Sequence, residues 1–158
     1  MGSEILLDKS SKQRLIIFRG VSGSGKTSLA RDWVSYDMQH RCLVGSNYIG
    51  TMLHGVPWTG RPMCEEAITL CKLVDIKVLL SAGFSVVNDD TNIVFTKFNA
   101  IRDIGWQLNI ETHVIDLRST PLEQCVLNDT RRRGRTVGRQ EIVRQIAVMK
   151  YETRFDVE

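Results

Sequence analysis

Residues 15–27 read LIIFRGVSGSGKT, and this stretch decides the fold of the chain. Its first four residues form a continuous apolar run, which is typical of a strand buried on both faces of a parallel sheet. Residues 20–27 match the phosphate-binding pattern G-x-x-x-x-G-K-[ST] in full. A helix is predicted over about residues 25–37, because apolar side chains recur there at helical spacing. A strand, this loop and a helix in that order are the context in which the pattern binds nucleotide phosphates.

The glycines of the loop let its backbone N–H groups approach phosphate oxygens closely, and the following helix adds a positive N-terminus. Lys26 is expected to be a catalytic cation that reaches the β- and γ-phosphates, and the Thr27 hydroxyl is expected to ligate Mg²⁺. A chance match in a Gly- and Ser-rich turn is the alternative, which the flanking strand and helix disfavour. We therefore expect ATP, or another nucleoside triphosphate, to be held by Ser22, Gly23, Ser24, Gly25, Lys26, Thr27 and Ser28.

The rest of the chain alternates short apolar runs with longer helical stretches, which is the pattern of an α/β protein. Further strands are predicted at residues 42–44, 84–87 and 110–117, and helices at about 62–82, 92–106, from 121 onward and 139–153. The sequence thus predicts one domain over residues 1–158, with a four-stranded parallel sheet flanked by helices and a flexible segment at 1–12. Side chains expected in the core include Trp33, Trp106 and, from the long helix, Ala67, Ile68, Cys71, Val74, Val78 and Leu79.

Composition excludes several classes of protein. Hydrophobic residues make up 42% and charged residues 25%, which fits neither a disordered chain nor a coiled coil. The net charge of +3 is small, but residues 118–154 hold nine Lys and Arg against four Asp and Glu, so one segment carries the positive charge. The four cysteines have no zinc-site spacing, and no apolar run approaches the roughly 18 residues of a membrane span. We expect a cytoplasmic protein that has no membrane partner.

The predicted strand at 84–87 ends in a polar tip, at the edge where a parallel sheet binds its ligands. Asp90 is expected to face magnesium together with Thr27. A solvated turn that caps the next helix is the alternative for these carboxylates. The residues of the tip that are expected to meet the acceptor substrate are Asp89, Asp90, Thr91 and Asn92.

These elements together resemble the kinase domain of the phage-type polynucleotide 5′-kinases. The resemblance covers about residues 15–151, and it rests on the loop at 20–27, on the Asp-Thr-Asn of residues 90–92 and on the Arg-Arg-Arg-Gly of residues 131–134. It implies a P-loop kinase fold that uses ATP and Mg²⁺ to phosphorylate the 5′-hydroxyl end of RNA or DNA. It also implies a basic lid at about 131–138, in which Arg133, and next Arg132, meets the transferring phosphoryl group.

Other functions share parts of this pattern. The phosphate-binding loop also occurs in small-molecule kinases, so a kinase for a sugar acid or a nucleoside is one alternative. A non-catalytic, nucleotide-regulated protein that binds nucleic acid is another. For a phage protein the expected cytoplasm is that of the host cell, and no phosphatase or ligase module is expected within these 158 residues.

In the family that the chain resembles, the second strand ends in an aspartate that takes the proton from the 5′-hydroxyl. Asn47 stands at that place here, and an amide can hold a hydroxyl but has no basic form at neutral pH. Three explanations stay open: an engineered Asp→Asn variant, a naturally inactive homologue, or a misaligned strand with Asp90 as the base. Asn47 would also cap the short helix that follows.

Trp58 and Arg61 are expected either to stack on a base and meet a phosphate of the acceptor, or to pack in a plain loop.

Overall fold

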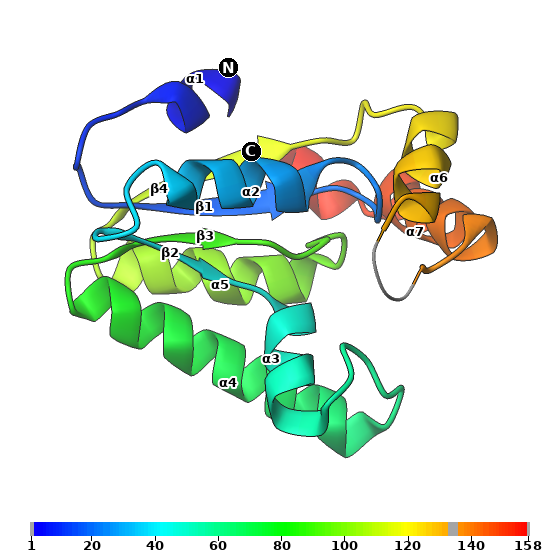
Figure 1. Ribbon diagram of the computed structural model, residues 1–158, viewed down its shortest axis with the longest axis horizontal. Coiled ribbons are helices and arrows are strands. Elements are labelled where there is room, and N and C mark those ends of the chain that lie inside the picture. Colours follow the sequence, from blue (N-terminus) through cyan, green and yellow to red (C-terminus); the bar gives the residue numbers. More distant parts are fainter. Residues whose placement is uncertain (1, 133–135, 158) are drawn as a thin grey trace.

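The computed structural model describes residues 2–132 and 136–157, and Figure 1 shows a sheet enclosed between helices. All neighbouring strands pair in parallel, in the order β2-β3-β1-β4. This arrangement confirms the predicted α/β class and the four-stranded parallel sheet. The strands are β1 (Arg14–Arg19), β2 (Arg41–Val44), β3 (Ser85–Asn88) and β4 (Glu111–Asp116).

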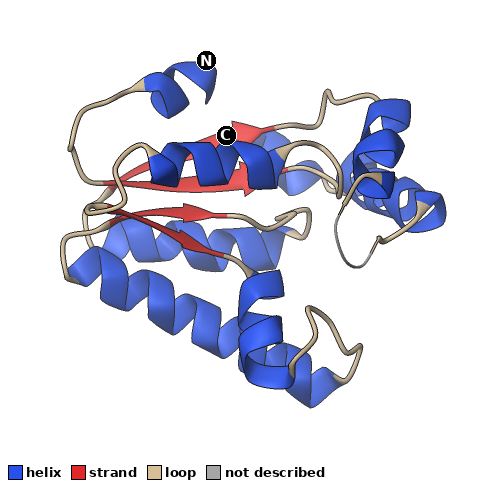
Figure 2. Cartoon of the chain, viewed as in Figure 1, coloured by secondary structure: helices blue, strands red, loops and turns tan. Residues whose placement is uncertain are grey.

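The helices are α1 (Gly2–Leu7), α2 (Lys26–Ser35), α3 (Ser46–His54), α4 (Pro62–Ser81), α5 (Phe95–Gln107), α6 (Leu122–Thr130), α7 (Arg139–Tyr151) and the 3-10 turn η1 (Thr153–Val157). Figure 2 shows α1 and α2 on one face of the sheet, α4 and α5 on the other, and α6 and α7 beyond the strand ends. No helix in the described part of the chain is both long and apolar enough to cross a membrane.

Strand β1 is the centre of the core. Its four apolar side chains are all fully buried, and they alternate between two clusters. Leu15 and Ile17 pack toward α4 and α5, whereas Ile16 and Phe18 pack toward α2. Both faces of the strand are therefore covered, as its unbroken apolar run predicts.

The segment at residues 1–12, expected to be flexible, contains α1, whose Ile5 and Leu6 pack against the core on the α2 side. Two packing predictions for α4 were wrong. On α4, Val74 and Val78 are 57% and 58% exposed. The helix has apolar side chains on more than one side, so periodicity alone does not select the buried face. The face that α4 does bury carries Ile68, Lys72, Ile76 and Leu80.

Trp106 also lies outside the core. It is 59% exposed, while Trp33 is 2% exposed as expected. The Arg102 guanidinium lies 4.4 Å from the centre of the Trp106 ring. The face of an indole ring attracts positive charge, so this contact with Arg102 can stabilise Trp106 at a partly exposed position on the helix surface.

Helix α5 begins at Phe95, three residues later than predicted, because Asn92 adopts a left-handed backbone conformation with φ 47°. The Asn92 side chain is buried, and its Nδ2 donates to the Phe18 carbonyl and to Asn88 Oδ1, both at 2.7 Å. Asn92 thereby joins the ends of β1 and β3. Asn92 was expected to meet the acceptor, and in the structure its side chain joins two strands of the sheet.

We expect Asn92→Ala to lower the free energy of unfolding by about 2–4 kcal/mol, because it removes two buried hydrogen bonds and places alanine at a positive φ. Asn92→Gly removes the same bonds but accepts this backbone conformation, so its loss should be smaller by about 1 kcal/mol. Urea titrations of the three proteins measure both effects. An unchanged midpoint for Asn92→Ala would contradict the proposed clamp between β1 and β3.

Candidate active site

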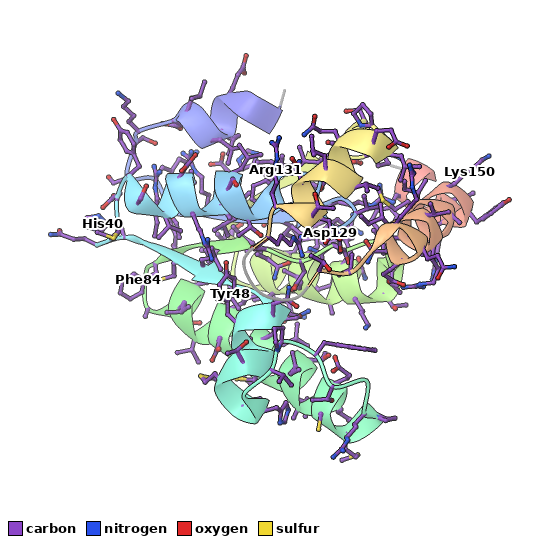
Figure 3. The ribbon with its side chains drawn as sticks, turned by 45° about the vertical axis from the view of Figure 1, so that its right-hand side comes forward. His40, Tyr48, Phe84, Asp129, Arg131 and Lys150 are labelled. Carbon is purple, nitrogen blue, oxygen red and sulfur yellow. The ribbon has the colours of Figure 1, made fainter. Side chains whose placement is uncertain are left out.

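The candidate site lies at the carboxyl ends of the strands, where residues 20–25 form the loop from β1 to α2. Figure 1 shows α3 on one side of this loop and α6 and α7 on the other. In Figure 3, Asp129 and Arg131 mark the end of α6 and Tyr48 marks α3, while His40 and Phe84 lie at the opposite end of the sheet. The crossovers of the fold therefore bring four separate segments to one edge, as is usual for ligand sites in open α/β sheets.

The shape of the loop requires glycine at two positions. Gly23 has φ 79°, and a Cβ there would lie 2.1 Å from the carbonyl oxygen of Cys125 in α6. Gly25 has φ 102° and precedes the first turn of α2. Both conformations disfavour any larger residue. The loop therefore leads the backbone into the positive end of α2, which fits the binding of phosphate groups.

Helices α6 and α7 hold this loop from outside. The Ser22 amide donates to Gln145 Oε1 at 2.8 Å, and Asn128 Nδ2 donates to the Gly23 carbonyl at 2.8 Å. A weaker bond of 3.4 Å joins Thr120 Oγ1 to the Ser24 carbonyl. Sequence reasoning missed these supporting residues, because contacts over about a hundred residues of sequence leave no local pattern.

Lys26 is almost fully buried inside the loop. Its Nζ donates to the carbonyls of Gly20 at 2.8 Å and Val21 at 2.6 Å, and to Ser24 Oγ at 3.2 Å. Burial is the main cause that lowers the pKa of Lys26 from 10.5 to about 8, while the charge of Asp89 opposes the change. The ammonium is thus poorly compensated by its present surroundings. Phosphate oxygens would supply the missing negative charge.

Thr27 meets the carboxylate of the residue directly after β3. Its Oγ1 donates to Asp89 Oδ2 at 2.9 Å. Burial raises the pKa of Asp89, and the hydrogen bond from Thr27 and the charge of Lys26 partly offset that rise. Asp90 was expected to face magnesium together with Thr27, but the carboxylate that hydrogen-bonds to Thr27 in the structure is that of Asp89. The difference is one residue, and it arises because adjacent side chains at a strand end point in different directions.

Asp90 is engaged on the other side of the strand end. Its Oδ2 lies 3.1 Å from Lys72 Nζ, and the two side chains are only 14% and 6% exposed. Asp90 also accepts hydrogen bonds from the Ser46 amide and from Asn88 Nδ2, each at 2.9 Å. Lys72 and Asn88 were missed by sequence reasoning. A lysine between Ile68 and Ile76 on the buried face of α4 is the signal that could have identified it.

The remaining predicted acceptor residues are spread over the carboxyl side of the sheet. The Thr91 carbonyl accepts a hydrogen bond of 2.9 Å from the Gly20 amide and so ties the start of the loop to β3. Asn47 is exposed in the first turn of α3. Trp58, 51% exposed, and Arg61 lie in the connection from α3 to α4 rather than on a strand end.

The basic segment after α6 is held at both sides by one buried carboxylate. Asp129 accepts hydrogen bonds from the amides of Val137 at 3.1 Å and Gly138 at 2.9 Å, and it lies 3.9 Å from Arg132 Nε. Arg132 is close enough to lower the pKa of both Lys26 and Asp89, so its charge reaches the phosphate-binding loop. Arg133, the first choice for the lid arginine, lies outside the described residues.

Much of the positive charge of residues 118–154 is neutralised locally. Three of its arginines form ion pairs with carboxylates of the same segment, at distances of 2.5 to 2.6 Å: Arg139 with Glu123, Arg144 with Glu141 and Arg154 with Glu152. The segment is therefore not a uniformly positive surface. Within the described residues of this segment, Arg132 is the arginine whose charge acts on Lys26 and Asp89.

The lowered pKa of Lys26 predicts a pH effect on stability. Below about pH 8 the folded and unfolded chains both carry the charge, and the folded chain bears the full cost of burying it. Between about pH 8 and 10 only the unfolded chain still holds the proton, so stability should rise with pH. Compared with Lys26→Met, the wild-type protein should therefore gain about 2 kcal/mol over this range. Urea titrations at pH 7.5 and 9.5 measure it, and a constant difference between the two proteins would refute the buried charge.

Solved structures share this architecture. A chain of the Pnkp1/Rnl/Hen1 RNA repair complex matches with a TM-score of 0.72 at 19% identity, over 93% of this chain and 47% of that one. APS kinase CysC of Mycobacterium tuberculosis, in complex with AMPPNP and APS, matches with 0.59 at 15% identity, over 76% and 70%. A gluconokinase from Sinorhizobium meliloti 1021 matches with 0.58 at 17% identity, over 91% and 78%. These likenesses establish the fold.

The present chain spans about half the length of the chain from the repair complex. No curated protein matches its sequence. A family model described as "AAA domain" matches residues 15–157, from the second residue of β1 to the end of η1. The chain therefore belongs to this family, and it shares the fold of the kinases that it matches.

Proposed function

We propose that this protein is an ATP-dependent polynucleotide 5′-hydroxyl kinase. The observation that carries the proposal is the tip of β3, where Asp89 meets Thr27 of the phosphate-binding loop and Asp90 meets the first turn of α3. One strand end thus adjoins a nucleotide side and an acceptor side. A phosphotransferase needs both sides at a fixed separation, because its catalysis is mainly positioning and charge stabilisation.

On the nucleotide side, the described residues fit ATP·Mg²⁺. We propose that Lys26 and the loop amides hold the phosphates, and that Thr27 and Asp89 face the magnesium ion. Asp89 replaces Asp90 in this role because only its carboxylate hydrogen-bonds to Thr27 among the contacts of the described residues. When bound, ATP·Mg²⁺ would supply the γ-phosphoryl group and a metal charge that neutralises it.

On the acceptor side, we propose that the hydroxyl group lies against the first turn of α3, which contains Ser46 and Asn47. Arg132 approaches from the other side of the loop, and it fits the role of a lid arginine because a guanidinium can pair with two phosphate oxygens. Arg133 stays a proposal on the resemblance alone. Trp58 and Arg61 are proposed as outer contacts of the acceptor strand, because an indole can stack on a base and a guanidinium can meet a phosphate.

A polynucleotide acceptor is proposed over a small molecule for two reasons. The Asp-Thr-Asn tip and the basic segment resemble the polynucleotide kinases, and the match to a chain of an RNA repair complex extends over more of this chain than the match to APS kinase. Because the chain also matches a gluconokinase, a small-molecule acceptor stays an alternative. The test must therefore include acceptors of both classes.

The direct test is transfer of radiolabelled γ-phosphate from ATP in the presence of Mg²⁺. We expect label on a 5′-hydroxyl RNA or DNA oligonucleotide and no label on gluconate, adenylyl sulfate or free nucleosides. A 5′-phosphorylated oligonucleotide is the matched control and should stay unlabelled. Label on a small molecule alone would identify a small-molecule kinase and overturn the polynucleotide assignment.

Restoring a carboxylate in the first turn of α3 should accelerate transfer. Asn47→Asp adds a group that can accept the proton of the hydroxyl, and a positioned general base is usually worth about 10²–10⁴-fold in rate. The gain should increase with pH as the new carboxylate loses its proton. Single-turnover rates of wild type, Asn47→Asp and Asp90→Asn decide between the two sites. If Asp90 is the base instead, Asn47→Asp will change little and Asp90→Asn will abolish transfer.

A further inference from the structure

The buried face of α4 carries a lysine whose presence the packing does not explain. Lys72 lies between Ile68 and Ile76 on that face, and its side chain is 6% exposed. Ile76 is fully buried and Ile68 nearly so. A buried ion pair is seldom more stabilising than apolar side chains of similar size, because both charges lose their hydration. Lys72 therefore suggests a task other than stability.

Lys72 and its partner Asp90 together hold one residue, Ser46, by two of its groups. Asp90 Oδ1 accepts a hydrogen bond from the Ser46 amide at 2.9 Å, and Lys72 Nζ donates to Ser46 Oγ at 3.2 Å. Asp90 Oδ2 lies 3.1 Å from Lys72 and accepts a bond of 2.9 Å from Asn88 at the end of β3. Ser46 is the first residue of α3. The pair thus fixes the start of α3 to the end of β3.

This start of α3 adjoins the phosphate-binding side directly. The Asp89 amide donates to the Val44 carbonyl at 3.0 Å, which ties the end of β2 to the end of β3. A Cβ on Gly45 would lie 2.9 Å from the Asp89 carbonyl, so the backbones are in close contact there. Asp89 in turn bonds to Thr27 at 2.9 Å. Asp89, which meets Thr27, and Asp90, which holds Ser46, are therefore consecutive residues directly after β3.

We propose that the Lys72–Asp90 ion pair positions the first turn of α3 so that Ser46 Oγ contacts the acceptor hydroxyl. This inference rests on the proposed phosphotransferase function and extends it. The ammonium of Lys72 occupies one lone pair of Ser46 Oγ, which leaves the hydroxyl proton and a second lone pair for the acceptor. Ser46 then orients the acceptor oxygen without taking its proton. Lys72 and Asp90 are positioning residues, and Ser46 is the residue that touches the substrate.

The test separates acceptor kinetics from nucleotide binding. Ser46→Ala removes the contacting hydroxyl, and we expect kcat/KM for a 5′-hydroxyl oligonucleotide to fall at least tenfold. The Kd for ATP·Mg²⁺, measured by calorimetry, should stay within twofold. Two controls should leave both quantities within twofold: Thr51→Ala, which removes a hydroxyl bonded to the α3 backbone, and Lys77→Met, which removes an exposed lysine of α4.

Lys72→Met tests the ion pair itself, but it leaves the Asp90 carboxylate buried without its cation and can unfold the protein for that reason alone. The double variant Lys72→Met with Asp90→Asn removes both charges. We expect it to melt within a few degrees of wild type while kcat/KM for the acceptor stays at least tenfold low. Once the single-turnover rates of Asp90→Asn have excluded Asp90 as the base, a purely structural ion pair predicts the opposite, because activity would then return with stability.

Normal acceptor kinetics in Ser46→Ala or in the folded double variant would overturn the inference. So would a parallel loss of ATP binding, which would place the effect on the nucleotide side. Failure of the proposed function has a different signature. In that case wild type labels gluconate or adenylyl sulfate instead of the oligonucleotide, and the same variants are compared on that acceptor. A wild-type protein that labels none of these acceptors overturns both proposals.

Discussion

The end of β3 carries two adjacent carboxylates that face different partners, and the organisation of the site depends on this division. Asp89 Oδ2 lies 2.9 Å from Thr27 Oγ1, and Asp90 Oδ2 lies 3.1 Å from Lys72 Nζ. β3 is a rigid support for both, because it is buried and pairs with β1 on one side and β2 on the other. The separation between the loop side and the α3 side is thus set by one backbone step, about 3.8 Å between Cα atoms. Neither side can move far without disturbing the sheet.

The phosphate-binding loop depends on helices that are distant in the sequence. Gln145 of α7 accepts a hydrogen bond from the Ser22 amide, and Asn128 of α6 donates one to the Gly23 carbonyl. The backbone of Cys125 leaves no room for a side chain at Gly23. Buried backbone groups must find partners, and these contacts supply them. The loop sequence alone could not hold this shape in isolation. The apolar side chains along the strands form the core that stabilises the fold. The polar and charged groups gather at the carboxyl ends of the strands. Burying a charged group there costs more free energy than burying an apolar one, and a ligand of opposite charge can offset that cost.

The sequence predicted the parts of this structure that local chemistry controls. A run of four apolar residues directly before the phosphate-binding loop is typical of a strand covered on both faces, and β1 is such a strand. The spacing of glycines and Lys26 predicted the loop, and the apolar runs predicted the positions of the other three strands within a few residues. Periodicity did not predict which side of α4 is buried or that Trp106 is exposed, because both depend on the neighbours that a helix meets.

What the sequence by itself determined is therefore the order of the elements, the parallel α/β class and the presence of a phosphate-binding loop. These follow from short-range preferences for strand, turn and helix. The tertiary structure decided which carboxylate meets Thr27, that Lys72 reaches Ser46, and that Gln145 holds the loop. The contacts from Thr27 to Asp89 and from Ser22 to Gln145 span 62 and 123 residues. Such contacts form only when whole layers pack, so the geometry of the packed sheet and helices fixes them and no local pattern records them.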